Sequence, residues 1–105
     1  MRVAIVEKAE WGGCCLNRGC VPKKAWYHSA QLVQASRRFA ARGLDGTLTP
    51  DLGRAWAHQR EVVESVRASY TDYLKRLGVV ALSGAARLGP NLTVAVNGDV
   101  LAARH

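Results

Sequence analysis

The sequence lacks the long hydrophobic stretch that a membrane-spanning helix requires. Its N-terminal apolar run, Val3–Val6, is far shorter than the about 18 residues of a bilayer span, and too short for the core of a signal peptide. The 105 residues also contain no internal repeat and no low-complexity tail. We therefore expect a single domain at most, in the cytoplasm, with no membrane partner.

Clustered charge is missing as well. The formal net charge is +7, yet no basic run exceeds two residues, as in Lys23–Lys24 and Arg37–Arg38. Scattered basic residues are typical of solvated helix faces, and no basic stripe or nucleic-acid-binding motif is present. We expect no nucleic-acid partner, although an anionic, phosphate-bearing cofactor stays compatible with the charge.

Cysteine is scarce, but all three cysteines, Cys14, Cys15 and Cys20, fall within seven residues. Such a cluster in a cytosolic chain favours redox chemistry or a metal site over a structural disulfide framework. Two of the thiols are adjacent and the nearest histidine is His28, which does not fit the ligand spacing of a tetrahedral site. We predict no metal, and from composition alone incidental buried cysteines stay possible.

The order of elements is predicted as β-loop-α-α-β-β-β. A short strand over residues 1–6 ends at Glu7, and a glycine-rich loop without helical period follows over residues 11–20. Pro22 suits the first turn of a helix that stops near Gly43. A second helix begins after a capping Asp51 and ends at Gly78, and strands follow at 79–82, 92–96 and 100–103, with an Asn97-Gly98 hairpin turn.

Both helices show apolar residues at three- and four-residue spacing, which predicts one buried face on each. The first face comprises Ala25, Trp26, Leu32, Val33, Ser36, Phe39 and Ala40, and the second comprises Leu52, Trp56, Val63, Val66, Tyr70, Tyr73 or Leu74, and Leu77. We expect Trp26, Trp56 and Phe39 in the core, and His28, His58 and His105 in surface or helix-packing roles.

Cys20 stands where a helix is expected to begin. A helix N-terminus presents free backbone N–H groups and partial positive charge, which stabilise a thiolate. Lys23 and Lys24 add positive charge near the first turn, and the flexible loop can bring Cys15 back to Cys20. The segment therefore suggests a reversible dithiol/disulfide pair.

The run Val3-Ala-Ile-Val-Glu7, followed by Gly12-Gly13-Cys14-Cys15-Leu16-Asn17-Arg18-Gly19-Cys20-Val21-Pro22-Lys23-Lys24, resembles the hallmark of the pyridine nucleotide-disulfide oxidoreductases. The family includes glutathione reductase, dihydrolipoamide dehydrogenase and mercuric reductase. The resemblance extends more loosely over the long helix, the turn at 83–86 and the closing strands, and so over essentially the whole chain.

The resemblance implies a role for each matching residue. Cys15 would be the thiol that attacks the substrate disulfide, and Cys20 the charge-transfer thiol against the flavin. Glu7 would bind the ribose of the FAD adenosine, although an ordinary exposed strand end is the alternative. The remaining FAD contacts would come from Gly13, Cys14, Cys15, Lys23 (with Lys24 as the competing lysine) and the backbone of Ala86. Tyr70 matches a tyrosine of the glutathione site, with a plain core or interface tyrosine about equally supported.

For the fold, the resemblance implies the α/β class: a partial Rossmann-like FAD-binding domain over residues 1–105, lacking the first βα unit. Its redox-active disulfide segment is residues 12–24. The Gly-x-Gly-x-x-Gly turn, the NAD(P)H domain and the dimerisation domain of the family are not found. We expect a fragment of a homodimeric parent enzyme, inactive in isolation.

The implied activity passes electrons from NADPH or NADH to FAD, then to the Cys15–Cys20 disulfide and to a substrate disulfide. Residues 21–24 and Tyr70 favour a glutathione-reductase-like member that acts on glutathione disulfide. The Leu16-Asn17-Arg18 run also fits a dihydrolipoamide dehydrogenase, and a non-catalytic remnant is the third alternative. Cys14 departs from the family, which usually has threonine there, and it puts simple two-thiol cycling in doubt.

Overall fold

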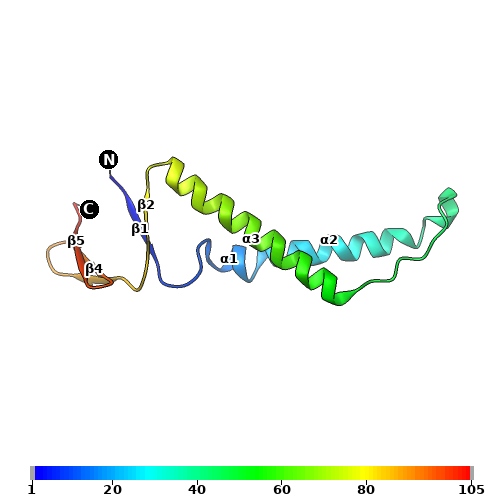
Figure 1. Ribbon diagram of the computed structural model, residues 1–105, viewed down its shortest axis with the longest axis horizontal. Coiled ribbons are helices and arrows are strands. Elements are labelled where there is room, and N and C mark those ends of the chain that lie inside the picture. Colours follow the sequence, from blue (N-terminus) through cyan, green and yellow to red (C-terminus); the bar gives the residue numbers. More distant parts are fainter. Residues whose placement is uncertain (1, 105) are drawn as a thin grey trace. The chain divides into compact units, whose positions relative to one another are not determined.

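The computed structural model describes residues 2–104, which divide into two compact units. One unit comprises residues 12–67, and the other comprises the residues up to 11 together with those from 68 onward. Figure 1 labels most of the helices and strands. No helix within residues 2–104 is both long enough and apolar enough to cross a bilayer.

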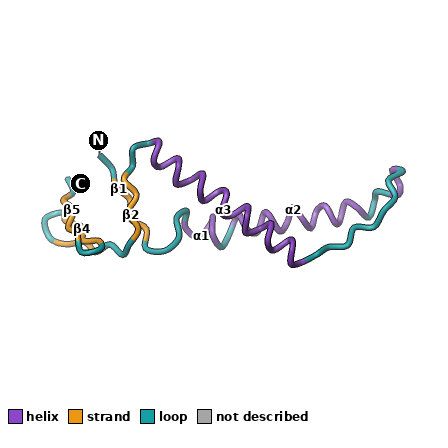
Figure 2. Tube along the Cα trace, in the orientation of Figure 1, coloured by secondary structure: helices purple, strands orange, loops and turns teal. Residues whose placement is uncertain are grey.

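The unit of residues 12–67 is helical. It contains α1 (Gly13–Asn17), α2 (Cys20–Ser36), the 3₁₀ turn η1 (Ala40–Arg42) and most of α3 (Leu52–Arg76), drawn in purple in Figure 2. Helix α1 corrects the prediction of a pure loop over residues 11–20. Gly12 and Gly13 both have positive φ, 99° and 68°, and this left-handed turn starts a helix too short to leave a periodic pattern in the sequence.

Helix α2 begins at Cys20 and carries Pro22 in its first turn, as predicted. It ends at Ser36, seven residues before the predicted stop at Gly43. The backbone then tightens into η1, and Gly43 follows in the left-handed conformation with φ 74°. Gly43 therefore terminates the 3₁₀ turn η1. The prediction that this glycine ends the preceding α-helix was wrong.

The predicted buried face of α2 is only half-buried. No residue of α2 is fully buried, Leu32 is 53% exposed, and Trp26 and Val33 are half-buried. The Trp26 ring packs against that of Trp56 on α3, with centroids 6.0 Å apart and planes tilted by 52°. Trp56 is itself 54% exposed, so the expectation of a core position was wrong for it. His28 and His58 are exposed, whereas His105 lies outside the described residues.

Helix α3 begins with the predicted cap. The Asp51 side-chain oxygen Oδ1 accepts a hydrogen bond from the Arg54 N–H at 3.0 Å, and the Asp51 carbonyl accepts one from Ala55. The buried positions of α3 are Gln59, Val63 and Leu74, and Ala55, Val62, Arg67 and Thr71 are half-buried.

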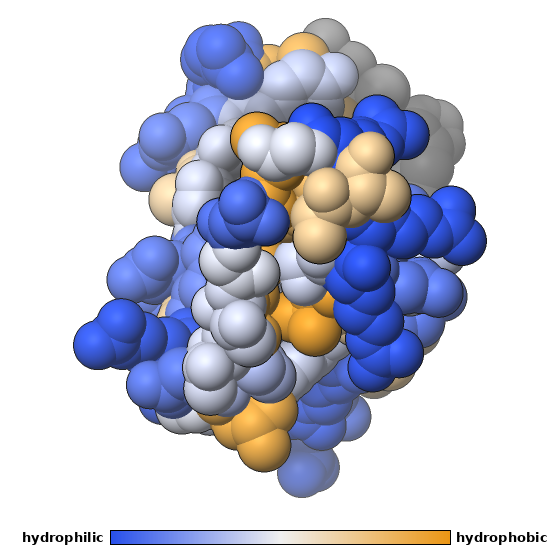
Figure 3. Space-filling view, turned by 90° about the vertical axis from the view of Figure 1, so that its right-hand side faces the viewer, coloured by the Kyte–Doolittle hydropathy of each residue, from blue (hydrophilic) through white to orange (hydrophobic). Residues whose placement is uncertain are grey.

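The predicted apolar stripe of α3 is confirmed at Val63 and Leu74, which are buried, but its other members are exposed. Leu52 is 73% exposed and Tyr73 52%, and Trp56, Val66, Tyr70 and Leu77 are exposed too. The apolar spacing could not mark the polar residues that share the buried side of the helix, namely the buried Gln59 and the half-buried Arg67 and Thr71. Figure 3 shows hydrophobic side chains in orange reaching the surface among hydrophilic blue ones.

The other unit is built on a parallel strand pair. Strand β1 (Ala4–Glu7) pairs with β2 (Val80–Ser83), in a register that sets Ala4 opposite Val80 and Glu7 opposite Ser83. Both strands were predicted to within a few residues. Within the described residues β1 has no second neighbour, and Val3 and Ile5 are 43% and 37% exposed.

A three-stranded antiparallel meander completes this unit. It consists of β3 (Arg87–Gly89), β4 (Thr93–Val96) and β5 (Asp99–Ala102), in the order β3-β4-β5. Asn97 and Gly98 both have positive φ, 52° and 89°, which matches the predicted two-residue hairpin turn. Strand β3 was not predicted, because three exposed residues give no alternating pattern.

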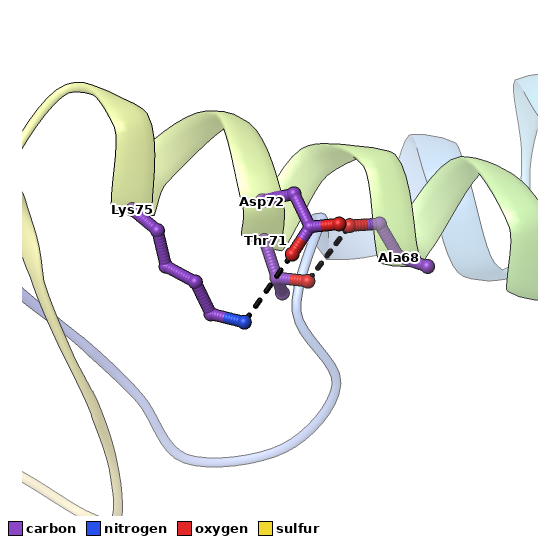
Figure 4. Close-up of polar contacts among 4 residues, drawn as sticks. All are labelled: Ala68, Thr71, Asp72 and Lys75. Atoms are coloured by element: carbon purple, nitrogen blue, oxygen red, sulfur yellow. Dashed lines mark hydrogen bonds and ion pairs between the residues drawn. The ribbon is translucent and has the colours of Figure 1, made fainter.

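The last turns of α3 belong to this unit as well. Leu74 is buried there, whereas the opposite side is polar. Figure 4 shows Lys75 Nζ donating to Asp72 Oδ1 at 3.2 Å and Thr71 Oγ1 donating to the Ala68 carbonyl at 2.9 Å. Both Lys75 and Asp72 are well exposed, so this pair adds little to stability.

Candidate functional site

A disulfide joins Cys15 to Cys20, with the two Cα atoms 4.8 Å apart. Cys15 is the middle residue of α1, and Cys20 is the first residue of α2. Both cysteines are exposed in this chain. The structure therefore brings together the two cysteines to which the resemblance assigned catalysis. Because both are exposed, the thiol of another molecule can reach their disulfide.

Gly19 lies close to the backbone of α1 where the chain turns between the two cysteines. A Cβ atom on Gly19 would lie 3.3 Å from the Cys14 carbonyl oxygen and 3.4 Å from the Cys15 Cα. Both neighbours are backbone atoms, which cannot move aside cheaply. A side chain at residue 19 would therefore require the α1 backbone to shift by a few tenths of an ångström.

A polar link holds the end of α1. The Asn17 side chain donates from Nδ2 to the Gly13 carbonyl at 2.9 Å, and its Oδ1 accepts from Arg67 Nε at 3.0 Å and from a terminal Arg67 nitrogen at 2.6 Å. Arg67 is half-buried on α3, and Leu16, beside Asn17, is 7% exposed. Sequence reasoning missed this pair, since no motif relates an asparagine and an arginine fifty positions apart.

The surroundings of the disulfide are positively charged. Cys20 lies at the N-terminus of a 17-residue helix that has no acidic residue in its first turn, and the exposed Lys23 and Lys24 follow. The partial charge of the helix end and the lysines both favour a thiolate at Cys20. Cys14 is an exposed free thiol on α1.

Glu7 lies at the carboxyl end of the parallel pair in the other unit. It is half-buried, and its Oε1 accepts a hydrogen bond from the Ala9 N–H at 2.8 Å. The Gly84 N–H donates to the Glu7 carbonyl at 2.8 Å, which extends the pairing past β2. The carboxyl edge of a parallel sheet is where such folds bind ligands, so the position of Glu7 fits a cofactor contact.

Ala86 lies in the short segment that leaves this same edge and leads into β3. It is exposed, and the turn before it is fixed because Asn97 Nδ2 donates to the Ser83 carbonyl at 2.7 Å. Trp11 Nε1 donates to Ser83 Oγ at 3.2 Å, which brings the chain after β1 to the end of β2. Glu7 and Ala86 are therefore carried by adjacent strand ends.

Tyr70 is 36% exposed on the part of α3 that belongs to the unit with the strands. The shallow depression on that stretch is lined by Ser69, Asp72, Lys75 and Arg76 rather than by Tyr70. Within residues 2–104 no group of three or more His, Cys, Asp or Glu side chains is placed to hold a metal ion.

Comparison with known proteins relates the chain to two named groups. It is 38% identical over 85 residues, or 80% of its length, to a dihydrolipoyl dehydrogenase of Mycobacterium tuberculosis. It is 35% identical over 104 residues, or 99% of its length, to the dihydrolipoyl dehydrogenase of Thermus scotoductus. No protein-family model matches the chain.

The solved structure of the HOCl-induced flavoprotein disulfide reductase RclA from Escherichia coli, a Cu(II) complex, matches with a TM-score of 0.69 and 27% identity. That match covers 91% of this chain and 19% of RclA. The chain likewise spans only 18% and 23% of the two dihydrolipoyl dehydrogenases. It thus corresponds to about a fifth of the length of each relative.

Proposed function

The chain belongs to the class I pyridine nucleotide-disulfide oxidoreductases, and we propose that it supplies the redox-active disulfide of a flavin-dependent disulfide reductase. The observation that carries the proposal is the exposed Cys15–Cys20 disulfide between the middle of α1 and the N-terminus of α2. The preference for this family, stated from the motif, is confirmed by its relatives.

Thiol–disulfide exchange at this pair takes two steps. The Cys15 thiolate attacks one sulfur of the substrate disulfide, which forms a mixed disulfide and releases the first substrate thiolate. The Cys20 thiolate then attacks the Cys15 sulfur, which restores the Cys15–Cys20 bond and releases the second. Two electrons pass from the dithiol to the substrate. Cys20 suits the second role because the helix N-terminus holds its negative charge between turnovers.

The chain offers residues that fit FAD. Of the two Glu7 carboxylate oxygens, Oε1 accepts a hydrogen bond within the described residues and Oε2 does not. Oε2 could therefore accept from a ribose hydroxyl. Gly13, Cys14, Cys15 and the exposed Lys23 would lie along the flavin, and the backbone of Ala86 would contact the cofactor. When bound, FAD would supply the two electrons that open the disulfide. NADPH or NADH would be the reductant.

For the substrate we propose a dithiol/disulfide pair of the lipoyl type. The relatives are named dihydrolipoyl dehydrogenase, and the Leu16-Asn17-Arg18 run fits such a member. Glutathione disulfide is the second candidate, favoured by residues 21–24 and by the partly exposed Tyr70. The two substrates separate cleanly in an assay, because only the first is a cyclic five-membered disulfide.

We also propose that turnover requires the parts of the relatives that this chain does not span. Those parts would bind NAD(P)H and form a homodimer, and the 105 residues would be a partial FAD-binding domain, inactive alone. The whole activity is then tested in a chimera of the Thermus scotoductus enzyme. In this chimera the 105-residue chain replaces the segment of the enzyme that aligns with it over 104 residues.

The chimera should bind FAD and, on anaerobic reduction by NADH or NADPH, develop a long-wavelength absorbance band. Cys20→Ser should abolish the band, whereas Cys15→Ser should keep it but lose activity with lipoamide and with glutathione disulfide. A chimera that binds FAD while the Cys15–Cys20 pair stays oxidised under excess reductant would overturn the proposal. The unmodified Thermus enzyme is the control for assembly.

A further inference from the structure

The Asn17–Arg67 link lies where it can govern the redox pair. Asn17 is the last residue of α1 and sits two positions after Cys15. Its side chain reaches back to the Gly13 carbonyl and outward to two nitrogens of Arg67, so it ties both ends of α1 to α3. All these residues belong to one compact unit.

Helix α1 needs such a tie when the disulfide opens. A helix of five residues does not persist by itself in water, because nucleation is costly and few hydrogen bonds repay it. After reduction the covalent bond to Cys20 is gone. The contacts that then help to hold α1 include the buried Leu16 and the Asn17–Arg67 hydrogen bonds.

Charge makes this link stronger than an ordinary side-chain contact. Arg67 is half-buried, and a guanidinium that donates twice to one carbonyl oxygen forms charge-assisted bonds of fixed geometry. The two charge-assisted bonds end on Asn17, the last residue of α1, and so favour the position that keeps Cys15 near Cys20.

We propose that Asn17 and Arg67 are positioning residues for the Cys15–Cys20 pair: they hold α1 in place in the dithiol state and so raise the effective concentration of one thiol at the other. This inference rests on the proposed function. Part of the disulfide's stability then depends on Arg67 of α3, outside the segment that carries the cysteines. Loosening the link should make the disulfide easier to reduce, because re-closure competes less well with an external thiol.

The test measures the equilibrium between the purified chain and mixtures of reduced and oxidised dithiothreitol. Dithiothreitol gives two electrons to the disulfide, Cys15 and Cys20 each end as thiols, and the reagent becomes its cyclic disulfide. After quenching with an alkylating agent, mass spectrometry counts the Cys15 and Cys20 adducts. Circular dichroism reports the helical content of each variant.

Asn17→Ala and Arg67→Ala should each shift the equilibrium about three- to tenfold toward the dithiol, the range expected for losing a partly exposed charge-assisted hydrogen bond. The double variant should shift no further than either single one, because both remove the same link. Asn17→Asp, which keeps an acceptor for Arg67, should restore most of the wild-type value. Arg60→Ala, at an exposed arginine of the same helix, should leave it unchanged.

Wild-type equilibria in both alanine variants, or a double shift equal to the sum of the single ones, would overturn the inference. If an alanine variant loses its helical signal, Asn17→Ser takes its place, since serine is polar but too short to reach Arg67, and it must show the same shift. If the wild-type pair never forms a reversible disulfide, the proposed function itself fails. A reversible but insensitive pair refutes the positioning role alone.

Discussion

Cys15 and Cys20 come from two different helices, and the two-residue connection of Arg18 and Gly19 sets their Cα atoms 4.8 Å apart. This distance lies within the range that a disulfide requires. The pairing therefore depends on the backbone path between the helices as much as on the cysteines. Changes to that path, and to the contacts around it, give the following expectations.

Replacing Gly19 by alanine should destabilise the oxidised chain by about 1 kcal/mol, because the new Cβ would press on the Cys14 carbonyl oxygen. Gly53→Ala is the matched control: it lies in the first turn of α3 and meets only the flexible Asp51 side chain. Helix propensity should make that change neutral or stabilising by up to about 1 kcal/mol. Urea unfolding followed by circular dichroism measures both, and equal losses would contradict the close-approach argument.

Replacing Cys14 by threonine should remove the one thiol that is reactive in the oxidised chain. Cys14 is exposed and outside the disulfide, so maleimide should label the oxidised wild type once and the variant not at all. The dithiothreitol equilibrium of Cys15–Cys20 should stay within about twofold, because threonine and cysteine differ little in size. A larger shift would mean that Cys14 exchanges with the pair.

Replacing Trp56 by alanine should cost about 1 kcal/mol of stability, since it removes the Trp26–Trp56 ring contact. Leu52→Ala, on the same helix but 73% exposed, should stay within about 0.5 kcal/mol of the wild type. Denaturant titration of the two variants side by side distinguishes a packed pair from two surface rings. Indistinguishable midpoints would speak against the contact.

Replacing Glu7 by glutamine in the chimera should weaken FAD binding about tenfold, because the amide keeps the Ala9 hydrogen bond but loses the charge offered to a ribose hydroxyl. Flavin fluorescence during titration gives the affinity. Glu61→Gln, at an exposed position of α3, serves as the control. An unchanged affinity for the Glu7 variant would remove it from the cofactor site.

The sequence predicted those parts of the fold that local rules govern. The Asn97-Gly98 turn needs positive φ at two positions, Pro22 fits only near a helix start, and Asp51 offers a cap. The redox pair was also found from sequence, because its motif is compact and its chemistry needs two cysteines beside a helix N-terminus.

Features set by packing were not predictable in the same way. The buried side of α3 includes Gln59 and Arg67, which apolar spacing could not mark, and the predicted stripe included the exposed Leu52 and Trp56. Helix α1 depends on two left-handed glycines and on a contact with a residue fifty positions away. Neither leaves a pattern within one stretch of sequence, and both decide how the disulfide is held.

The central claim is that Cys15 and Cys20 form a reversible redox pair. Trypsin cleaves after Arg18, so it separates the peptide that carries Cys14 and Cys15 from the one that carries Cys20. Alkylation, digestion and fragment mass spectrometry across a dithiothreitol series should show the two peptides joined through Cys15, with Cys14 alkylated, and released in one two-electron transition that reverses on reoxidation. Joining through Cys14, or independent alkylation of Cys15 and Cys20 in the oxidised chain, would contradict the account.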